Sequence, residues 1–204
     1  MEINGIKIEA GAKLVNANLR HRNLNGLDLR GADLTGANLT GTHLEGTNLS
    51  KANLTGAKLY DAYATGADFT GAKLYKANLV AGDFTSARFI AADLKASNLT
   101  KALLRYANLS IAQCTGANFI GTDLNKSEMF ETNLECANLF GADVSFSNLF
   151  RANLIGAYLF EANLIDTNLC EADLRESVLD YAVMTGAILT DTKISSEQFK
   201  TTIH

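Results

Sequence analysis

Leucine recurs every five residues through most of this 204-residue chain. In the stretch DLTGANLTGTHLEGTNLSKANLTG, residues 33–56, the repeated leucines are Leu34, Leu39, Leu44, Leu49 and Leu54. An α-helix repeats every 3.6 residues and a β-strand every 2, so neither element has this spacing. The period therefore indicates a solenoid in which a short unit of backbone is repeated many times.

The repeat forms one unbroken register along the chain. Its central apolar residue, here called the pivot, occupies numbers ending in 4 or 9, from Leu14 to Ile194. Two residues before the pivot stands a small side chain, usually alanine, and the residue between them is often Asn or Asp. Fourteen of the 16 glycines occupy numbers ending in 1 or 6. That regularity predicts a positive φ at one site of a repeated turn.

The segments GADLTGANLTG, KANLTGAKLY and FRANLIGAYLFEANLIDTNL resemble the A-(D/N)-L-x-x motif of pentapeptide-repeat proteins, and the resemblance spans residues 12–196. It implies an all-β fold, a right-handed quadrilateral parallel β-helix with four pentapeptides per coil. Residues 12–194 would then form about nine coils and a rod about 43 Å long, at ~4.8 Å per coil. Proline, which would interrupt a continuous ladder of backbone hydrogen bonds, is absent from the chain.

This fold predicts which side chains meet inside the rod. Residues 20 apart stack, so the small pivot Ala64 lies beneath Phe84 and conserves core volume, unless that pairing arises by chance. Phe69 and Phe89 form a second vertical pair. Arg22 and Leu27 are too large for the small-residue position, so we expect the first coil to be open or covered by residues 1–11.

Both ends of the chain depart from the repeat. Residues 1–11 begin with MEINGIKI, which alternates around Asn4–Gly5 and predicts a short hairpin capping the first coil. Residues 195–204 predict a short helix that closes the last coil. Its N-cap candidates are Ser195 and Ser196, and Phe199 and Ile203 are spaced i, i+4. A frayed tail is the alternative.

Candidate chemistry is sparse. The histidines, His21, His43 and His204, are too scattered for a metal cluster. Cys114 is a pivot and should be buried, whereas Cys136 and Cys170 point outward on different sides, which disfavours a disulfide. Glu171 and Asp173 could form a general acid–base pair, but a rod without loop insertions offers them no pocket. We therefore predict no catalytic, cofactor or metal site and no enzyme activity.

Large apolar residues stand just after several pivots in the second half of the chain. The candidate interaction surface is Ile120, Phe130, Phe140, Phe150 and Phe160. Stacked apolar side chains of this kind mark interfaces. They also stabilise neighbouring strands, which is the alternative interpretation.

Charge is divided along the chain. The net charge is −4, with about +3 in residues 1–102 and about −7 in residues 103–204. The candidate acidic surface is Glu131, Glu161, Glu171 and Glu176. Arg151 should lie between Glu131 and Glu171 and neutralise part of it.

Two functions fit these features. The first is a protein-interaction or scaffold module, with another protein or a second copy as its partner. The second comes from the family resemblance: a rod that mimics DNA and binds a type II topoisomerase, DNA gyrase. Missing loop inserts, leucine-rich pivots and a short polar C-terminal segment weigh against it. We expect a cytoplasmic protein without membrane association, direct nucleic-acid binding or a cofactor.

Overall fold

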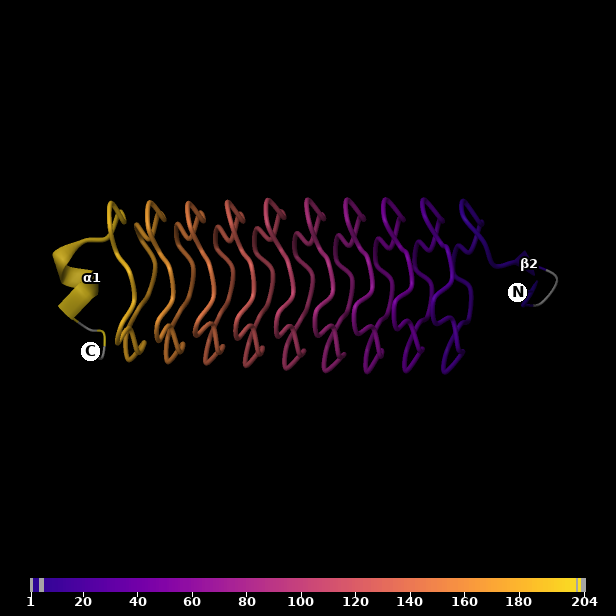
Figure 1. Ribbon diagram of the computed structural model, residues 1–204, viewed down its shortest axis with the longest axis horizontal. Helices are drawn as coiled ribbons and strands as arrows, with labels where there is room; N and C mark the ends of the chain where they lie inside the picture. Colours follow the sequence, from indigo (N-terminus) through magenta and orange to yellow (C-terminus); the bar gives the residue numbers. More distant parts are fainter. Residues whose placement is uncertain (1, 4–5, 201, 203–204) are drawn as a thin grey trace.

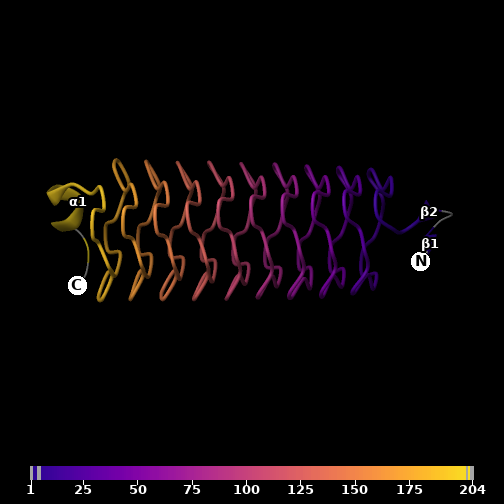
Figure 2. The ribbon, with the colours of Figure 1, turned by 45° about the horizontal axis from the view of Figure 1, so that its top comes forward.

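The structure is a computed structural model that describes residues 2–3, 6–200 and 202. From Lys13 to Lys193, the residue before each pivot forms a parallel bridge with the residue 20 positions away, as Asn38 does with Lys58. The coils stack along one long axis with the two termini at opposite ends (Figure 1). A second view shows the same succession of coils from another side (Figure 2). The repeat region is therefore a parallel β-solenoid with a 20-residue coil.

Backbone hydrogen bonds connect each coil to the next. The Leu34 N–H donates to the Asn53 carbonyl at 2.7 Å, and the Asn53 N–H donates to the Ala32 carbonyl at 2.9 Å. The same pairing recurs along the rod. Each coil thereby satisfies the polar edge of its neighbour, which an isolated coil could not do for itself.

The corner of each pentapeptide adopts the predicted left-handed conformation. Every position ending in 1 or 6, from Gly11 to Asp191, has a positive φ, between 51 and 73°. The pivot carbonyl accepts the N–H three residues later, as Leu34 does from Ala37 at 2.9 Å. Many of these corners carry a side chain, including the β-branched Ile111 at a φ of 55°. Stacking therefore imposes the turn even where glycine is missing, at a cost of about 1 kcal/mol or more per residue.

The Asn or Asp before the pivot has a local structural role. The Asn53 side-chain oxygen accepts the Thr55 N–H at 3.2 Å, and Asn118 accepts the Ile120 N–H at 3.0 Å. A short side chain with an acceptor three bonds from the Cα suits this arrangement. The preference for Asn and Asp therefore reflects turn formation rather than ligand binding.

The pivots fill a dry interior. Phe69 and Phe89 stack in parallel with ring centroids 4.8 Å apart, which confirms that predicted pair. Phe84 meets both rings edge-on, at 6.0 and 5.7 Å. It fits above Ala64 because Gly82 also makes room: a Cβ on Gly82 would lie 2.6 Å from the Phe84 ring. This steric limit explains the off-register glycine.

Ser and Thr replace alanine at several small-residue positions without leaving a buried hydroxyl unpaired. Thr42 donates to the Leu19 carbonyl and Thr122 to the Leu99 carbonyl, each at 2.8 Å. These bonds cross to the preceding coil. A buried hydroxyl is tolerated because its hydrogen bond offsets the cost of desolvation.

The N-terminal end contains the predicted strand pair. Strands β1 (Glu2–Ile3) and β2 (Ile6–Lys7) pair antiparallel, and the turn residues 4–5 lie outside the described residues. Ile8 follows and is buried against the core. In the first coil Arg22 is exposed and Leu27 is half-buried, as their size predicts.

The C-terminal helix α1 (Ser196–Lys200) is shorter than the predicted 195–204, and residues 201, 203 and 204 lie outside the described part. Ser195 is its N-cap: its Oγ accepts the Gln198 N–H at 3.2 Å, and its N–H donates to Gln198 Oε1 at 3.0 Å. Gln198 Nε2 also donates to the Leu174 and Ser177 carbonyls, both at 2.8 Å. Gln198 therefore connects the helix to two carbonyl groups of the preceding coil. Within the described residues, no helix is both long and apolar enough to cross a bilayer.

Candidate functional site

Four aromatic rings gather on one side of the rod, and we call them the aromatic patch: Phe140, Tyr158, Phe160 and Tyr181. Phe140 and Phe160 stack with centroids 5.8 Å apart. Tyr158 lies 6.4 Å from the first ring and 6.0 Å from the second, and Tyr181 meets Phe160 edge-on at 5.2 Å. Exposed fractions are 37% for Phe140, 39% for Tyr158 and 59% for Tyr181. The rings form one continuous apolar surface that faces solvent.

The repeat register explains why these residues meet. Leu159 is a buried pivot, so its neighbours Tyr158 and Phe160 both project outward on the same side. Phe140 lies one coil away from Phe160, and the predicted residue Ile120 continues the column, half-buried, one coil further. Sequence reasoning identified the phenylalanine column but missed Tyr158, although its place just before the pivot is a usable signal.

Tyr181 stands at a corner where glycine is the easier residue. Its φ is 60°, and the same column holds glycine at Gly121 and Gly141. An L side chain with positive φ costs of order 1 kcal/mol, as it does at the other corners that lack glycine. The exposed tyrosine extends the patch from this corner.

The other two predicted phenylalanines form a separate ladder. Phe130 and Phe150 stack with centroids 5.9 Å apart, and both are half-buried. They are ten residues, half a 20-residue coil, out of phase with the aromatic patch. They therefore lie on the opposite side of the rod. The Arg151 guanidinium carbon lies 4.8 Å from the Phe150 centroid and covers that ring.

Arg151 also organises two of the predicted glutamates. Its Nε lies 2.7 Å from Glu171 Oε2, and its Nη1 lies 3.7 Å from Glu131 Oε1. The hydrogen bond to Glu171, with a smaller contribution from Glu131, raises the pKa of Arg151. The predicted partial neutralisation is confirmed, and it places this pair of carboxylates beside the Phe130–Phe150 ladder.

The remaining acidic residues flank the aromatic patch. Glu176 stands at the corner before this face and Glu161 at the corner after it, and both are exposed. Asp180, half-buried, follows Phe160 in its column. Among the described residues, no basic nitrogen lies within 4.0 Å of these three carboxylates, since the ion pairs involve other acids. The four predicted glutamates are thus divided between two surfaces.

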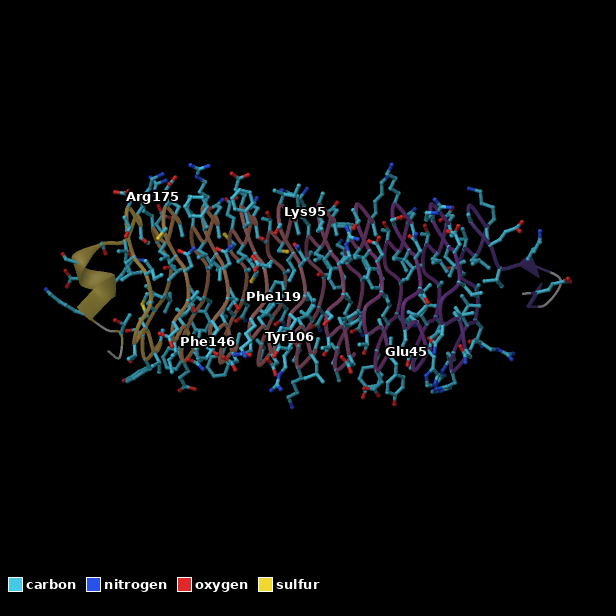
Figure 3. The ribbon with its side chains drawn as sticks, viewed as in Figure 1. Glu45, Lys95, Tyr106, Phe119, Phe146 and Arg175 are labelled. Carbon is cyan, nitrogen blue, oxygen red and sulfur yellow. The ribbon has the colours of Figure 1, made fainter. Side chains whose placement is uncertain are left out.

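In a third column of exposed rings, a lysine side chain lies between the two aromatic residues. Tyr106 and Phe146 are 56% and 53% exposed, and Lys126 lies between them with Nζ 5.7 and 5.9 Å from the two centroids. Figure 3 shows Tyr106 and Phe146 along one edge of the rod, with Arg175 along the opposite edge. Cation–π contact already occupies the space between these two rings.

The other polar residues have structural partners. Asp173 pairs with Arg175 at 2.6 Å and Lys193 at 3.5 Å. The Arg175 side-chain hydrogen bond is the main cause that lowers the pKa of Asp173 to about 2. Glu171 is held by Arg151. Asp173 therefore lacks the raised pKa that a general acid needs, and Glu171 is engaged in an ion pair.

Among the residues that the structure describes, the histidines and cysteines do not gather into a site. His43 lies 3.3 Å from Glu45 and stacks on Tyr63 at 4.9 Å. Burial raises the pKa of the Cys114 thiol, and Cys136 and Cys170 are free cysteines on different columns. Within the described part of the chain, no three His, Cys, Asp or Glu residues are grouped to hold a metal ion.

Comparison with known proteins agrees with the geometry. The family model described as pentapeptide repeats matches residues 12–50, 47–85, 83–112, 107–145 and 157–195. This chain belongs to the pentapeptide-repeat family. No curated protein sequence matches it.

Solved pentapeptide-repeat structures share its fold. One is HetL from the cyanobacterium Nostoc sp. strain PCC 7120, a protein involved in heterocyst differentiation regulation. It is 31% identical, with a TM-score of 0.57 and 89% of each chain covered. A trypsin-treated variant of QnrB1, a plasmid-mediated fluoroquinolone resistance protein, is 17% identical with a TM-score of 0.57. The match covers 87% of this chain and 93% of QnrB1. At that identity the likeness to QnrB1 concerns the fold alone.

Proposed function

We propose that this pentapeptide-repeat protein is a non-enzymatic interaction module and that its aromatic patch binds another protein. The single observation that supports this role is the contiguity of four exposed or half-exposed rings on one face. Exposed aromatic clusters are enriched in protein interfaces, where they supply most of the binding energy.

The Phe130–Phe150 ladder provides the internal contrast. It too stacks, but it is half-buried and covered by Arg151. A ladder that only stabilises adjacent strands has no need of further exposed rings. The aromatic patch has two, Tyr158 and Tyr181. These additions favour binding over strand stabilisation.

The partner is another protein or a second copy of this chain, which would make a homodimer. A role without catalysis is supported by the ion pairs of Glu171 with Arg151 and of Asp173 with Arg175, which engage the two candidate catalytic carboxylates. Three free thiols fit a reducing compartment, and we propose the cytoplasm as the location.

Changing Phe140 and Phe160 together to serine tests the proposal. We expect the variant to lose the ability to capture a partner protein from a lysate of the native cell, or to lose self-association in sedimentation experiments. Its melting temperature should be largely unchanged. The matched control changes Phe130 and Phe150 to serine and should leave association intact. Equal capture and equal sedimentation by the native protein and the Phe140/Phe160 variant would contradict the proposal.

DNA mimicry toward a type II topoisomerase is the alternative, and the surface charge supports it less. Glu131 and Glu171 share Arg151, and the four predicted glutamates occupy three of the four corners. The test is inhibition of DNA gyrase supercoiling at micromolar concentration by the native protein. Changing Glu131, Glu161, Glu171 and Glu176 to lysine should then abolish inhibition, because mimicry depends on a negative field.

A further inference from the structure

We propose that the segment bound by the aromatic patch is a basic amphipathic helix lying along the rod axis. Its apolar side packs on the rings, and its lysines or arginines approach Glu176 on one flank and Glu161 on the other. A further basic residue approaches Asp180 at the end of the phenylalanine column. This inference rests on the proposed function, since it names the partner of the same surface.

The charges around the patch carry the first part of the argument. Glu176 and Glu161 stand at the two corners that bound this face, and Asp180 extends the phenylalanine column. All three lack a cation within 4.0 Å among the described residues, because the ion pairs involve other carboxylates. Arg175, next to Glu176, is held by Asp173 at 2.6 Å. The apolar face is therefore rimmed by unpaired negative charge on both sides, which a basic partner complements.

The spacing of the rings carries the second part. Successive coils are about 4.8 Å apart along the rod, and Phe140 and Phe160, one coil apart, have ring centroids 5.8 Å apart. Tyr181 lies to the side of this column, at the next corner, 5.2 Å from Phe160. One turn of an α-helix rises about 5.4 Å, close to the coil spacing. Side chains on one face of a β-strand repeat at roughly 6.7 Å, twice the rise per residue. A helix along the rod can thus place an apolar side chain near successive rings, whereas a strand departs from the coil spacing by about 2 Å at each step.

The length of the surface agrees with a short helix. From the coil of Ile120 to the coil of Asp180 there are three steps of about 4.8 Å, or roughly 14 Å in total. A helix of about ten residues spans that distance, with apolar residues at i, i+3, i+4 and i+7 facing the rings. Basic residues on either side of that stripe then reach both acidic flanks.

Three synthetic peptides of about 15 residues test this, each labelled for fluorescence anisotropy against the full chain. The first carries leucines at helical spacing with flanking lysines. The second has the same leucines with flanking glutamates. The third has the composition of the first in an alternating, strand-like order. We expect the first peptide to bind at least about tenfold more tightly than the other two and to weaken as sodium chloride rises toward ~0.5 M.

Variants of the protein test which of its carboxylates contribute to binding of the lysine peptide. Changing Glu161 and Glu176 to glutamine and Asp180 to asparagine should weaken the lysine peptide about tenfold. The matched control removes three carboxylates outside the patch, through Asp61→Asn, Glu128→Gln and Asp166→Asn, and should change binding less than about twofold.

The outcomes separate this inference from the proposed function. No binding of the lysine peptide, equal binding of the glutamate or alternating peptide, or indifference to the Glu161/Glu176/Asp180 change would each overturn the basic helix. Loss of partner capture in the Phe140/Phe160 variant would still uphold the aromatic patch as an interface. Failure of that capture experiment would instead remove the proposed function, and with it this inference.

Discussion

Two phenylalanine ladders occupy the same position of the repeat on opposite sides of the rod, yet their surroundings differ. Phe130 and Phe150 are half-buried, and Arg151 lies over Phe150. Phe140 and Phe160 are joined instead by two exposed tyrosines. The position just after the pivot therefore allows either role, and the neighbouring columns select between them.

The two ladders also differ in the residue at the corner that follows each phenylalanine. After Phe150 the corner is Arg151, whose charge and length close the ladder and tie it to Glu131 and Glu171. After Phe140 the corner is Gly141, which has no side chain to cover the ring. Arg151 thus covers part of one ladder, whereas Gly141 leaves Phe140 of the other exposed to solvent.

The largest effect is expected from a substitution in the buried interior, which neither ladder occupies. Leu109→Asp should unfold the protein or make it insoluble, because Leu109 is fully buried. An unpaired buried carboxylate costs several kcal/mol, comparable with the whole stability of a domain. Thr100→Asp, half-buried just after a pivot, should be tolerated. Thermal melts followed by circular dichroism measure both, and equal melts would disprove the inward and outward register.

A smaller effect should separate the two ladders in stability. Changing Phe130 and Phe150 to serine should lower the free energy of unfolding by about 2 kcal/mol, because both burial and the cation–π contact are lost. The same change at Phe140 and Phe160 should cost about 1 kcal/mol, since Phe140 is exposed rather than half-buried. Urea unfolding of both variants measures the difference. The opposite order would show that the aromatic patch is the stabilising ladder.

The smallest expected effect concerns the residue that closes the enclosed ladder. Arg151→Ala should destabilise the protein by about 1 kcal/mol or less, because its ion pairs and its ring contact are half-exposed. Arg151→Lys keeps the charge but loses the planar contact, so it should recover part of that loss. Urea midpoints at low and high salt check this. A destabilisation that salt leaves unchanged would assign the whole effect to packing rather than to Glu131 and Glu171.

The 20-residue coil was implied by the family resemblance, whereas the sequence by itself determined the five-residue period and the inward direction of the pivots. It also predicted the positive φ at every corner and the Phe69–Phe89 pair. These features follow from local repetition, since each pentapeptide places the same atoms in the same environment. One register, once found, therefore applies to the whole rod.

Only the tertiary structure decided how the columns combine. Tyr158 joins Phe140 across 18 positions, and Arg151 covers Phe150 while its counterpart Gly141 leaves Phe140 open. Gly82 is needed because the Phe84 ring would meet its Cβ. The physical reason is that exposure and pairing depend on side-chain volumes and directions in adjacent coils. A five-residue repeat specifies the direction in which each side chain leaves the backbone. Contacts with the coils above and below decide its conformation and its exposure.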